Sequence, residues 1–458
     1  MSAANLVDAV LAHPPMASLW SDENLVRTWL RTEVALAEVL HAEGLVPNEA
    51  LLAIQASAQL ENLDLDELRR GTRIVGMPIK PLVDQVVAAG GPLVGSYFHR
   101  GATTQDVLDT AQALRISASI ALLQPQLREL LARLMDMADV HRATPMVART
   151  NSQDASVTSW GLHVASYAAE LARHLERLAG LTPRACTVML GGAVGTLSAW
   201  PGRGLQIRRQ LAQRLGLSEP AGAWNGSQDN IVELVQWTGL VLGSLVRMAN
   251  DFELMGRAAL GELRRQTREG ASSTMPHKTN PRDANTIQTL FQLGTMYVGQ
   301  AAHLMAQVDV RSAAQRAAAW TVVPGALGAA SAALARANAM VEAVVVDPER
   351  MRANFAHSRG HVMSEAVMFV VAEAVGKDEA YRRVREALDQ APSDLDIEAA
   401  LLASAELVGT VDAETLSRAC DPTHYLGESD ALINEALEAA RAALEQPWPS
   451  LDDHDFER

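Results

Sequence analysis

The sequence predicts an all-α protein, and two observations carry this prediction. Of its 458 residues 48% are hydrophobic but only 4% are aromatic, so the core must consist of Leu, Val, Ala and Met, which suit closely packed helices. Long segments also carry apolar residues at helical spacing, and we find no β-rich section, fixed-period repeat or low-complexity tract. We therefore expect helices along the whole chain.

The expected helices change in length along the chain. Residues 23–45 are predicted as a helix because Leu25, Trp29 and Leu40 follow helical spacing and Gly44 ends the pattern. Long helices are then predicted over residues 105–124, 125–142, 152–182, 229–269 and 282–323. Beyond about residue 347 the helices shorten and acidic residues accumulate.

This change in length predicts three domains. They are an N-terminal helical domain over residues 1–95, a central long-helix bundle over 96–346 and a C-terminal helical domain over 347–458. An apolar stripe as long as that of residues 229–269 needs partner helices along its whole length. Either one subunit or an oligomer could supply these partners, and composition does not separate the two.

Charge and cysteine content restrict the partners. The net charge of −15 argues against nucleic acid and anionic membranes as partners, although a local basic cluster could still bind an anionic substrate. Two distant cysteines, Cys186 and Cys420, favour a reducing compartment without disulfides. We expect no signal peptide and no apolar stretch of membrane-spanning length, and hence a cytoplasmic protein.

Residues 270–281, with the sequence GASSTMPHKTNP, are the most informative segment. This stretch is rich in hydrogen-bond donors, contains two prolines and lies between two long predicted helices, which is typical of a site rather than of a connector. Lys278 is one of three lysines in a chain that otherwise uses arginine. A lysine suits a position that needs a compact charge directed at a carboxylate.

This segment resembles the signature loop of the fumarase/aspartase superfamily, G-x-S-S-x-M-P-x-K-x-N-P. Two earlier segments are similar to the other site regions of that family, in the same order along the chain, and the resemblance extends from Trp20 to about Leu388. They are residues 96–106, SYFHRGATTQD, and residues 149–154, RTNSQD. Members of this family form homotetramers around a core of twenty long helices, with each active site assembled from three subunits.

The resemblance implies roles for individual residues. Ser272 matches the catalytic base, whose alkoxide must be stabilised by backbone N–H groups and a nearby cation. An isolated serine would more often bond its own backbone. Lys278 and Asn280 match the groups that hold the substrate carboxylate next to the carbon that loses its proton. Further substrate contacts are implied for Thr103, Thr104, Thr150, Gln153, Ser273 and Arg311.

Two of these positions also have a local interpretation. Thr103 and Thr104 precede a predicted helix start, where hydroxyls and free N–H groups can hold an anion. On local grounds alone an ordinary threonine N-cap explains them equally. The resemblance implies no metal and no organic cofactor, and a small dicarboxylate as substrate.

Asn151 departs from the family pattern. Most members have a histidine at this position, assigned as the general acid for the leaving group or as part of a proton relay, and an amide has no proton to give near neutral pH. Three interpretations follow: the enzyme is inactive, His99 serves alone as acid or relay, or the leaving group needs no proton. Because the neighbouring motifs are intact, inactivity is the weakest of the three.

The function predicted from these residues is an anti β-elimination from a C2-substituted succinate, which gives fumarate and a weakly basic leaving group such as nitrite. A carboxymuconate-type cycloisomerase is the alternative with the same fold, because the loop reads Met-Pro-His-Lys as in that branch. Arg316 and Ala319, however, stand where cycloisomerases usually have Trp and Glu. A non-catalytic helical scaffold is the alternative from another class, and the matches at Ser272, Lys278 and Asn280 argue against it.

Overall fold

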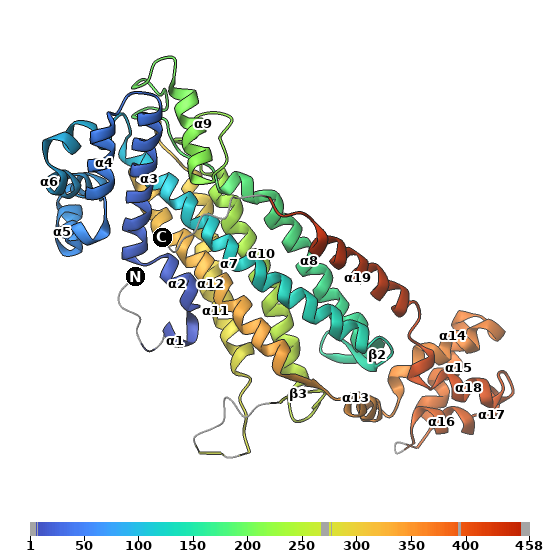
Figure 1. Cartoon of the computed structure of the whole chain (residues 1–458). Helices are drawn as coiled ribbons and strands as arrows, with labels where there is room; N and C mark the ends of the chain where they lie inside the picture. The colour runs from blue at the N-terminus through green and yellow to red at the C-terminus, as the bar shows by residue number, and fades with distance from the viewer. Residues whose placement is uncertain (1–5, 7, 267–273, 276, 393–394, 450–458) are drawn as a thin grey trace.

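The structure is a computed structural model that describes residues 6, 8–266, 274–275, 277–392 and 395–449. Figure 1 shows an elongated molecule built around long, roughly parallel helices, with a cluster of short helices at each end. The helical fold predicted from composition and periodicity is confirmed. The boundaries of the three predicted domains remain a prediction.

Helices α3 to α6 lie together at one end of the long bundle, whereas α1 and α2 lie along its side, where Arg336 of the central bundle donates to the Val10 carbonyl at 3.2 Å (Figure 1). The longest is α3, which confirms the helix expected over residues 23–45; the Ser21 hydroxyl caps it by accepting from the Asn24 N–H at 3.2 Å. The helices of this region are α1 (Asp8–Leu11), α2 (Pro14–Leu19), α3 (Asp22–Ala42), α4 (Asn48–Ser57), η1 (Leu60–Asn62), α5 (Leu65–Val75) and α6 (Ile79–Tyr97).

The central bundle consists of five long helices and one shorter one. They are α7 (Thr104–Val140), α8 (Trp160–Ala185), α9 (Gly204–Leu215), α10 (Asp229–Met255), α11 (Arg282–Ala301) and α12 (Ala313–Ala343). Their buried faces consist mainly of Leu, Val, Ala and Met, as the composition predicts. At about 1.5 Å per residue, the 37 residues of α7 span about 55 Å, so its two ends lie at opposite ends of the bundle.

Two predicted breaks at proline are wrong. Pro125 lies inside α7, which therefore replaces the two helices expected over 105–124 and 125–142. Proline lacks the N–H that would bond to the carbonyl of Ala121, and because Ala121 is exposed, water can satisfy that carbonyl. Pro324 likewise lies inside α12, beside the exposed Trp320.

The helix expected over residues 152–182 is also wrong at its start. β1 (Pro145–Thr150) and β2 (Gln153–Ser159) form an antiparallel hairpin that pairs Thr150 with Gln153, and α8 begins only at Trp160. The two turn residues, Asn151 and Ser152, have φ of +51° and +62°, which is the conformation of the type I′ turns that favour Asn.

The other two long predictions also fail at their ends. α10 stops at Met255, where β3 (Leu263–Arg265) follows and pairs with β4 (Val344–Val346). The helix expected over 282–323 is two antiparallel helices, α11 and α12. Between them residues Ala302–Met305 form a 3-10 turn, and Asp309 takes a φ of +57°, so the chain reverses.

A second, smaller core lies among the C-terminal helices at the far end of the bundle (Figure 1). The last helix, α19, leaves this group and returns along α8, and at its start Asp430 pairs at 2.6 Å with Arg142, which follows the end of α7. The elements are α13 (Pro348–Asn354), η3 (Phe355–Ser358), η4 (His361–Met363), α14 (Ser364–Val375), α15 (Lys377–Gln390), α16 (Ile397–Ala403), α17 (Ala405–Val408), α18 (Ala413–Ala419), η5 (Pro422–His424) and α19 (Ser429–Glu445).

Two helices, α10 and α12, are long and apolar enough to cross a membrane by length and composition alone. The expectation that no stretch reaches this length is therefore wrong. In the structure the most apolar windows of these helices are 56% and 61% buried within the bundle, as is common for core helices.

Candidate active site

The start of α7 carries the first group of predicted site residues. Gly101 precedes it with a φ of +79°, and a Cβ there would lie 2.4 Å from the Trp200 ring, so only glycine fits. Thr103 is the N-cap residue, and its N–H donates to the Asp106 carboxylate at 2.9 Å. Thr104 is the first residue of the helix, so the prediction of a helix start at these threonines is confirmed.

Asp106 fastens a second loop to this helix start. Its carboxylate accepts from the N–H groups of Gly191 and Gly192, in the loop between α8 and α9, at 2.9 and 3.0 Å. Burial raises the pKa of Asp106 to about 6, although the three backbone donors act in the opposite direction. The position of Thr103 is therefore set by a buried hydrogen-bond network that holds two loops together.

His99 lies at the same place and has a buried partner. Its Nδ1 is 2.5 Å from Oε1 of Glu33, a residue of α3 whose side chain has no exposed surface. Burial lowers the pKa of His99, but the charge and hydrogen bond of Glu33, together with the charge of Asp106, outweigh it and raise the pKa overall. His99 therefore tends to keep its proton, which is what a general acid or a carboxylate-binding group requires.

An arginine from a distant part of the sequence also contacts this helix start. Arg311 donates to the Thr103 hydroxyl at 3.3 Å. Asp109, in the second turn of α7, is buried, and this burial raises its pKa to about 6 despite the charges of Arg316 and Arg311. We call His99, Thr103, Thr104 and Arg311 the N-cap cluster. This cluster presents N–H groups, hydroxyls and positive charge, as a carboxylate site requires.

The second group of predicted residues lies at the tip of the β1–β2 hairpin. Thr150, Asn151 and Gln153 are all exposed there. Arg149 anchors the base of the tip, since its guanidinium makes a bidentate ion pair with the buried Glu262 at 2.6 and 2.8 Å. The hairpin therefore holds these three polar side chains in solvent at a fixed position.

The third group lies in the loop before α11. Ser272 and Ser273 lie outside the described residues. Lys278 is exposed, and its N–H donates to the Met275 carbonyl at 3.0 Å, while Asn280 is half-buried. In the described part of the chain no group of three His, Cys, Asp or Glu side chains is placed to hold a metal ion.

The structure brings some predicted residues together and separates others. The N-cap cluster lies at one end of the bundle. The hairpin and the loop lie at the other end (Figure 1). Two ion pairs connect them through β3: Arg149 of the hairpin pairs with Glu262 just before β3. Arg265 of β3 pairs with Asp283 of α11 at 2.8 Å. The length of α7, about 55 Å, separates the two ends. One chain therefore does not collect the three groups in a single place.

Four buried carboxylates of the site were not predicted from the sequence: Glu33, Asp106, Asp109 and Glu262. Asp106 carries a local signal, because a threonine followed three residues later by an acid is typical of a capping box. Glu33 carries none: it lies 66 positions before His99 and looks like an ordinary polar residue of an amphipathic helix.

Comparison with known proteins agrees with this fold. A family model described as "Lyase" matches residues 9–292, and one described as "Adenylosuccinate lyase C-terminus" matches residues 360–436. The chain belongs to the fumarase/aspartase superfamily of lyases.

Individual relatives cover nearly the whole chain. A 3-carboxy-cis,cis-muconate cycloisomerase of Pseudomonas aeruginosa is 32% identical over 98% of this chain and 99% of its own length. Trans-aconitate decarboxylase 1 of Mycosarcoma maydis is 32% identical over 96% of this chain and 90% of its own. The crystal structure of a 3-carboxy-cis,cis-muconate lactonizing enzyme from Pseudomonas putida superposes with a TM-score of 0.92 at 32% identity, covering 96% of this chain and all of the other.

Proposed function

We propose that this protein is a cytoplasmic lyase that eliminates a weakly basic group from a C2-substituted succinate and releases fumarate, with nitrosuccinate as its leading substrate. The observation that carries the proposal is Asn151. Its amide occupies the position of the usual family histidine and has no proton to give near neutral pH. An enzyme with intact carboxylate-binding segments and no acid there suits a leaving group that departs as a stable anion.

The proposed step needs a base and cations but no acid. Ser272 removes a proton from the methylene carbon next to one carboxylate, and Lys278 and Asn280 stabilise the resulting dianion. The electron pair of the broken C–H bond forms the double bond. The bond from C2 to the leaving group then breaks, and nitrite departs with its electron pair. The products are fumarate, nitrite and the proton taken by the base.

The local charge of the N-cap cluster supports an anion-rich substrate. Arg316 replaces the Trp that cycloisomerases usually have, and its charge acts on the buried Asp109 together with that of Arg311. Ala319 replaces a usual Glu and removes a negative charge. Both changes make this end of the bundle more positive, which favours an anionic substrate such as a dicarboxylate.

We also propose that the active unit is a homotetramer with shared sites. The separation of the N-cap cluster from the other two groups supports this, because a small dicarboxylate cannot contact both ends of α7. Exposed apolar side chains on α10 and α11 also suit partner helices: Leu240, Leu254, Leu293 and Met296. Light scattering should give about four times the chain mass of 49.1 kDa. A monomer at micromolar concentration would contradict the shared site.

A substrate panel tests the reaction. Succinates with nitro, amino, hydroxyl and thioether groups at C2 are mixed with the protein, and fumarate is followed by its absorbance and nitrite by a colour reaction. We expect equal amounts of fumarate and nitrite from nitrosuccinate, with little turnover of the amino and hydroxyl compounds. 3-Carboxy-cis,cis-muconate belongs in the same panel because the relatives favour a cycloisomerase as the second candidate. Turnover of that compound alone would replace our proposal by the second one.

A further inference from the structure

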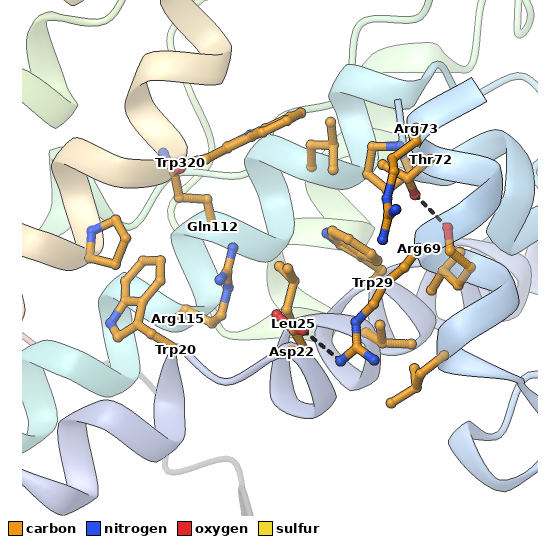
Figure 2. A pocket seen from close by; sticks show the side chains of 16 residues that line it. Trp20, Asp22, Leu25, Trp29, Arg69, Thr72, Arg73, Gln112, Arg115 and Trp320 are labelled. Carbon is orange, nitrogen blue, oxygen red and sulfur yellow. Dashed lines mark hydrogen bonds and ion pairs between the residues drawn. The ribbon is translucent and has the colours of Figure 1, made fainter. Parts of the chain in front are cut away.

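A cavity of about 410 Å³ lies between the N-terminal helices and the central bundle. Its walls come from α3, α5, α7 and α12 and are mostly apolar (Figure 2). Three indole rings contribute to these walls, those of Trp20, Trp29 and Trp320. The volume lies within the range of pockets that bind small organic molecules, about 300–1,000 Å³.

Arg115 on the α7 wall of this cavity has no anionic partner. The residue is 6% exposed, and within the described ranges no carboxylate pairs with it. Its guanidinium carbon lies 4.4 Å from the centre of the Trp20 ring, and its Nε lies 3.5 Å from the Ala111 carbonyl. Burial lowers the pKa of Arg115 to about 9, so the group is still charged at neutral pH. A buried charge is normally paired, because an unpaired one is strongly destabilising.

A second donor lines the same cavity without an acceptor. The indole N–H of Trp29 is fully buried and has no hydrogen-bond partner among the described residues. Gln112, 7% exposed, lies about one turn before Arg115 on α7 and adds an amide to the same wall. The carboxylate of Asp22 also lines the cavity, but it is bound to Arg69 at 2.8 Å. The wall of the cavity therefore contains more hydrogen-bond donors than acceptors.

We propose that this cavity is a binding site for a small organic carboxylate with a flat apolar body. The planar guanidinium of Arg115 can hold a carboxylate through two parallel hydrogen bonds, and the Gln112 amide can supply a third donor. The body of the ligand lies against the indole rings, where flat apolar groups stack favourably. A bare inorganic anion would satisfy the donors but leave these apolar walls unused.

The proposed ligand is not the succinate of the elimination reaction. Thr103 and Arg115 lie on the same helix about three turns apart, which corresponds to about 18 Å. A four-carbon dicarboxylate held by the N-cap cluster cannot reach Arg115. The cavity therefore goes beyond the proposed function and takes a second molecule.

Calorimetric titration of the full-length protein tests this site. The probes are benzoate, 1-naphthoate and indole-3-acetate, with 1-naphthamide as the neutral analogue and inorganic phosphate as the bare anion. We expect at least one aromatic carboxylate to bind at least tenfold more tightly than either comparison compound. Failure of all three carboxylates, or equal binding of the amide, would overturn the proposal.

Variants at two arginines separate the site from its surroundings. Arg115→Met should weaken carboxylate binding at least tenfold, whereas Arg70→Gln, at an exposed arginine of α5 that pairs with Glu67 and does not line the cavity, should change it less than twofold. Arg115→Met should also raise the Tm of the unliganded protein, because it removes a buried unpaired charge. A lower Tm with unchanged binding would mean that Arg115 is structural.

Competition decides whether the cavity belongs to the substrate site. Saturating 1-naphthoate should leave the affinity for fumarate unchanged. If the two compounds exclude each other, the cavity is an extension of the substrate site, and the inference of a second ligand fails even though the proposed lyase activity stands. If fumarate release is absent but naphthoate binds through Arg115, the proposed function fails and this inference stands.

Discussion

The start of α7 and the tip of the β1–β2 hairpin carry two parts of the predicted site and are built in opposite ways. At the helix start two carboxylates are buried and paired within one chain: Glu33 with the half-buried His99, and Asp106 with three backbone N–H groups. At the hairpin tip Thr150, Asn151 and Gln153 are exposed. The carboxylates of the first region therefore have their hydrogen-bond partners within the chain, whereas the polar side chains of the second region face solvent.

This difference indicates which property each region controls. A change at the helix start removes buried hydrogen bonds, so it should lower both stability and activity. A change at the hairpin tip removes no intrachain contact of a buried group, because Arg149 and Glu262 hold its base. Such a change should affect activity alone. The predictions below test this division, from the largest expected effect to the smallest.

Ser272→Ala should abolish turnover. Loss of a base that acts only in the transition state should lower kcat by about two to four powers of ten and leave KM nearly unchanged. Steady-state kinetics on the proposed substrate provide the measurement, with Lys278→Ala as the matched variant that should raise KM as well. Near wild-type turnover by Ser272→Ala would place the base elsewhere.

Mixing of inactive variants sharpens the same prediction. If the N-cap cluster and the loop serve one site from different subunits, a refolded mixture of Ser272→Ala and Arg311→Ala should recover part of the lost activity, because some sites then contain neither substitution. Each variant refolded alone is the control. No recovery in tetramers shown to be mixed would contradict the shared site.

Asp106→Ala should cause the largest loss of stability. It leaves the buried N–H groups of Gly191 and Gly192 without acceptors, and an unsatisfied buried donor costs about 1–3 kcal/mol, so we expect a loss of about 3–5 kcal/mol in the free energy of unfolding. Urea denaturation provides the measurement. Asp64→Ala, at the exposed cap of α5, is the control and should cost less. Equal losses of unfolding free energy in the two variants would mean that the buried Asp106 network stabilises the fold no more than an exposed helix cap does.

The sequence predicts the helical fold and the helix start at Thr103 because both depend on local patterns. It fails where distant contacts or solvent decide the outcome. Pro125 and Pro324 remain inside helices because exposed carbonyls lose little there, and Asn151 and Ser152 form a hairpin turn within a segment too short to show a clear strand pattern.

The pairing of His99 with Glu33 illustrates the limit for the site. Nothing in the sequence around Glu33 distinguishes it from other acidic residues of α3, and only the packing of that helix against α7 buries it next to His99. Local motifs thus predict candidate ligand-binding residues. They do not identify residues that hold those groups in place.

Glu33→Gln should lower the pKa of His99. The carboxylate raises this pKa in the native protein, so the pair stabilises the fold fully below the unfolded pKa of about 6.5, and this stabilisation is lost as the pH rises through the higher folded value. If protonated His99 takes part in the reaction, activity falls as the pH rises through its pKa. The variant should therefore lose activity at lower pH than the wild type.

The pH profile of kcat/KM is the measurement for Glu33→Gln. Glu38→Gln, on the same helix but paired with Arg214 and Gln55, is the control and should leave the profile unchanged. The stability difference between Glu33→Gln and the wild type should shrink as the pH rises. An unshifted profile with the same loss of stability would make His99 a structural residue only.

Asn151→His should have the smallest effect on the proposed reaction. A general acid contributes about two to four powers of ten when the leaving group needs a proton, and almost nothing for nitrite. The variant should therefore not accelerate nitrosuccinate turnover, but it should introduce a trace of activity on amino-substituted succinate. Because Asn151 is exposed at a turn whose positive φ histidine also tolerates, the Tm should stay close to that of the wild type. Efficient release of ammonia by the wild-type protein would show that another residue supplies the proton, with His99 as the first candidate, and would exclude nitrite as the defining leaving group.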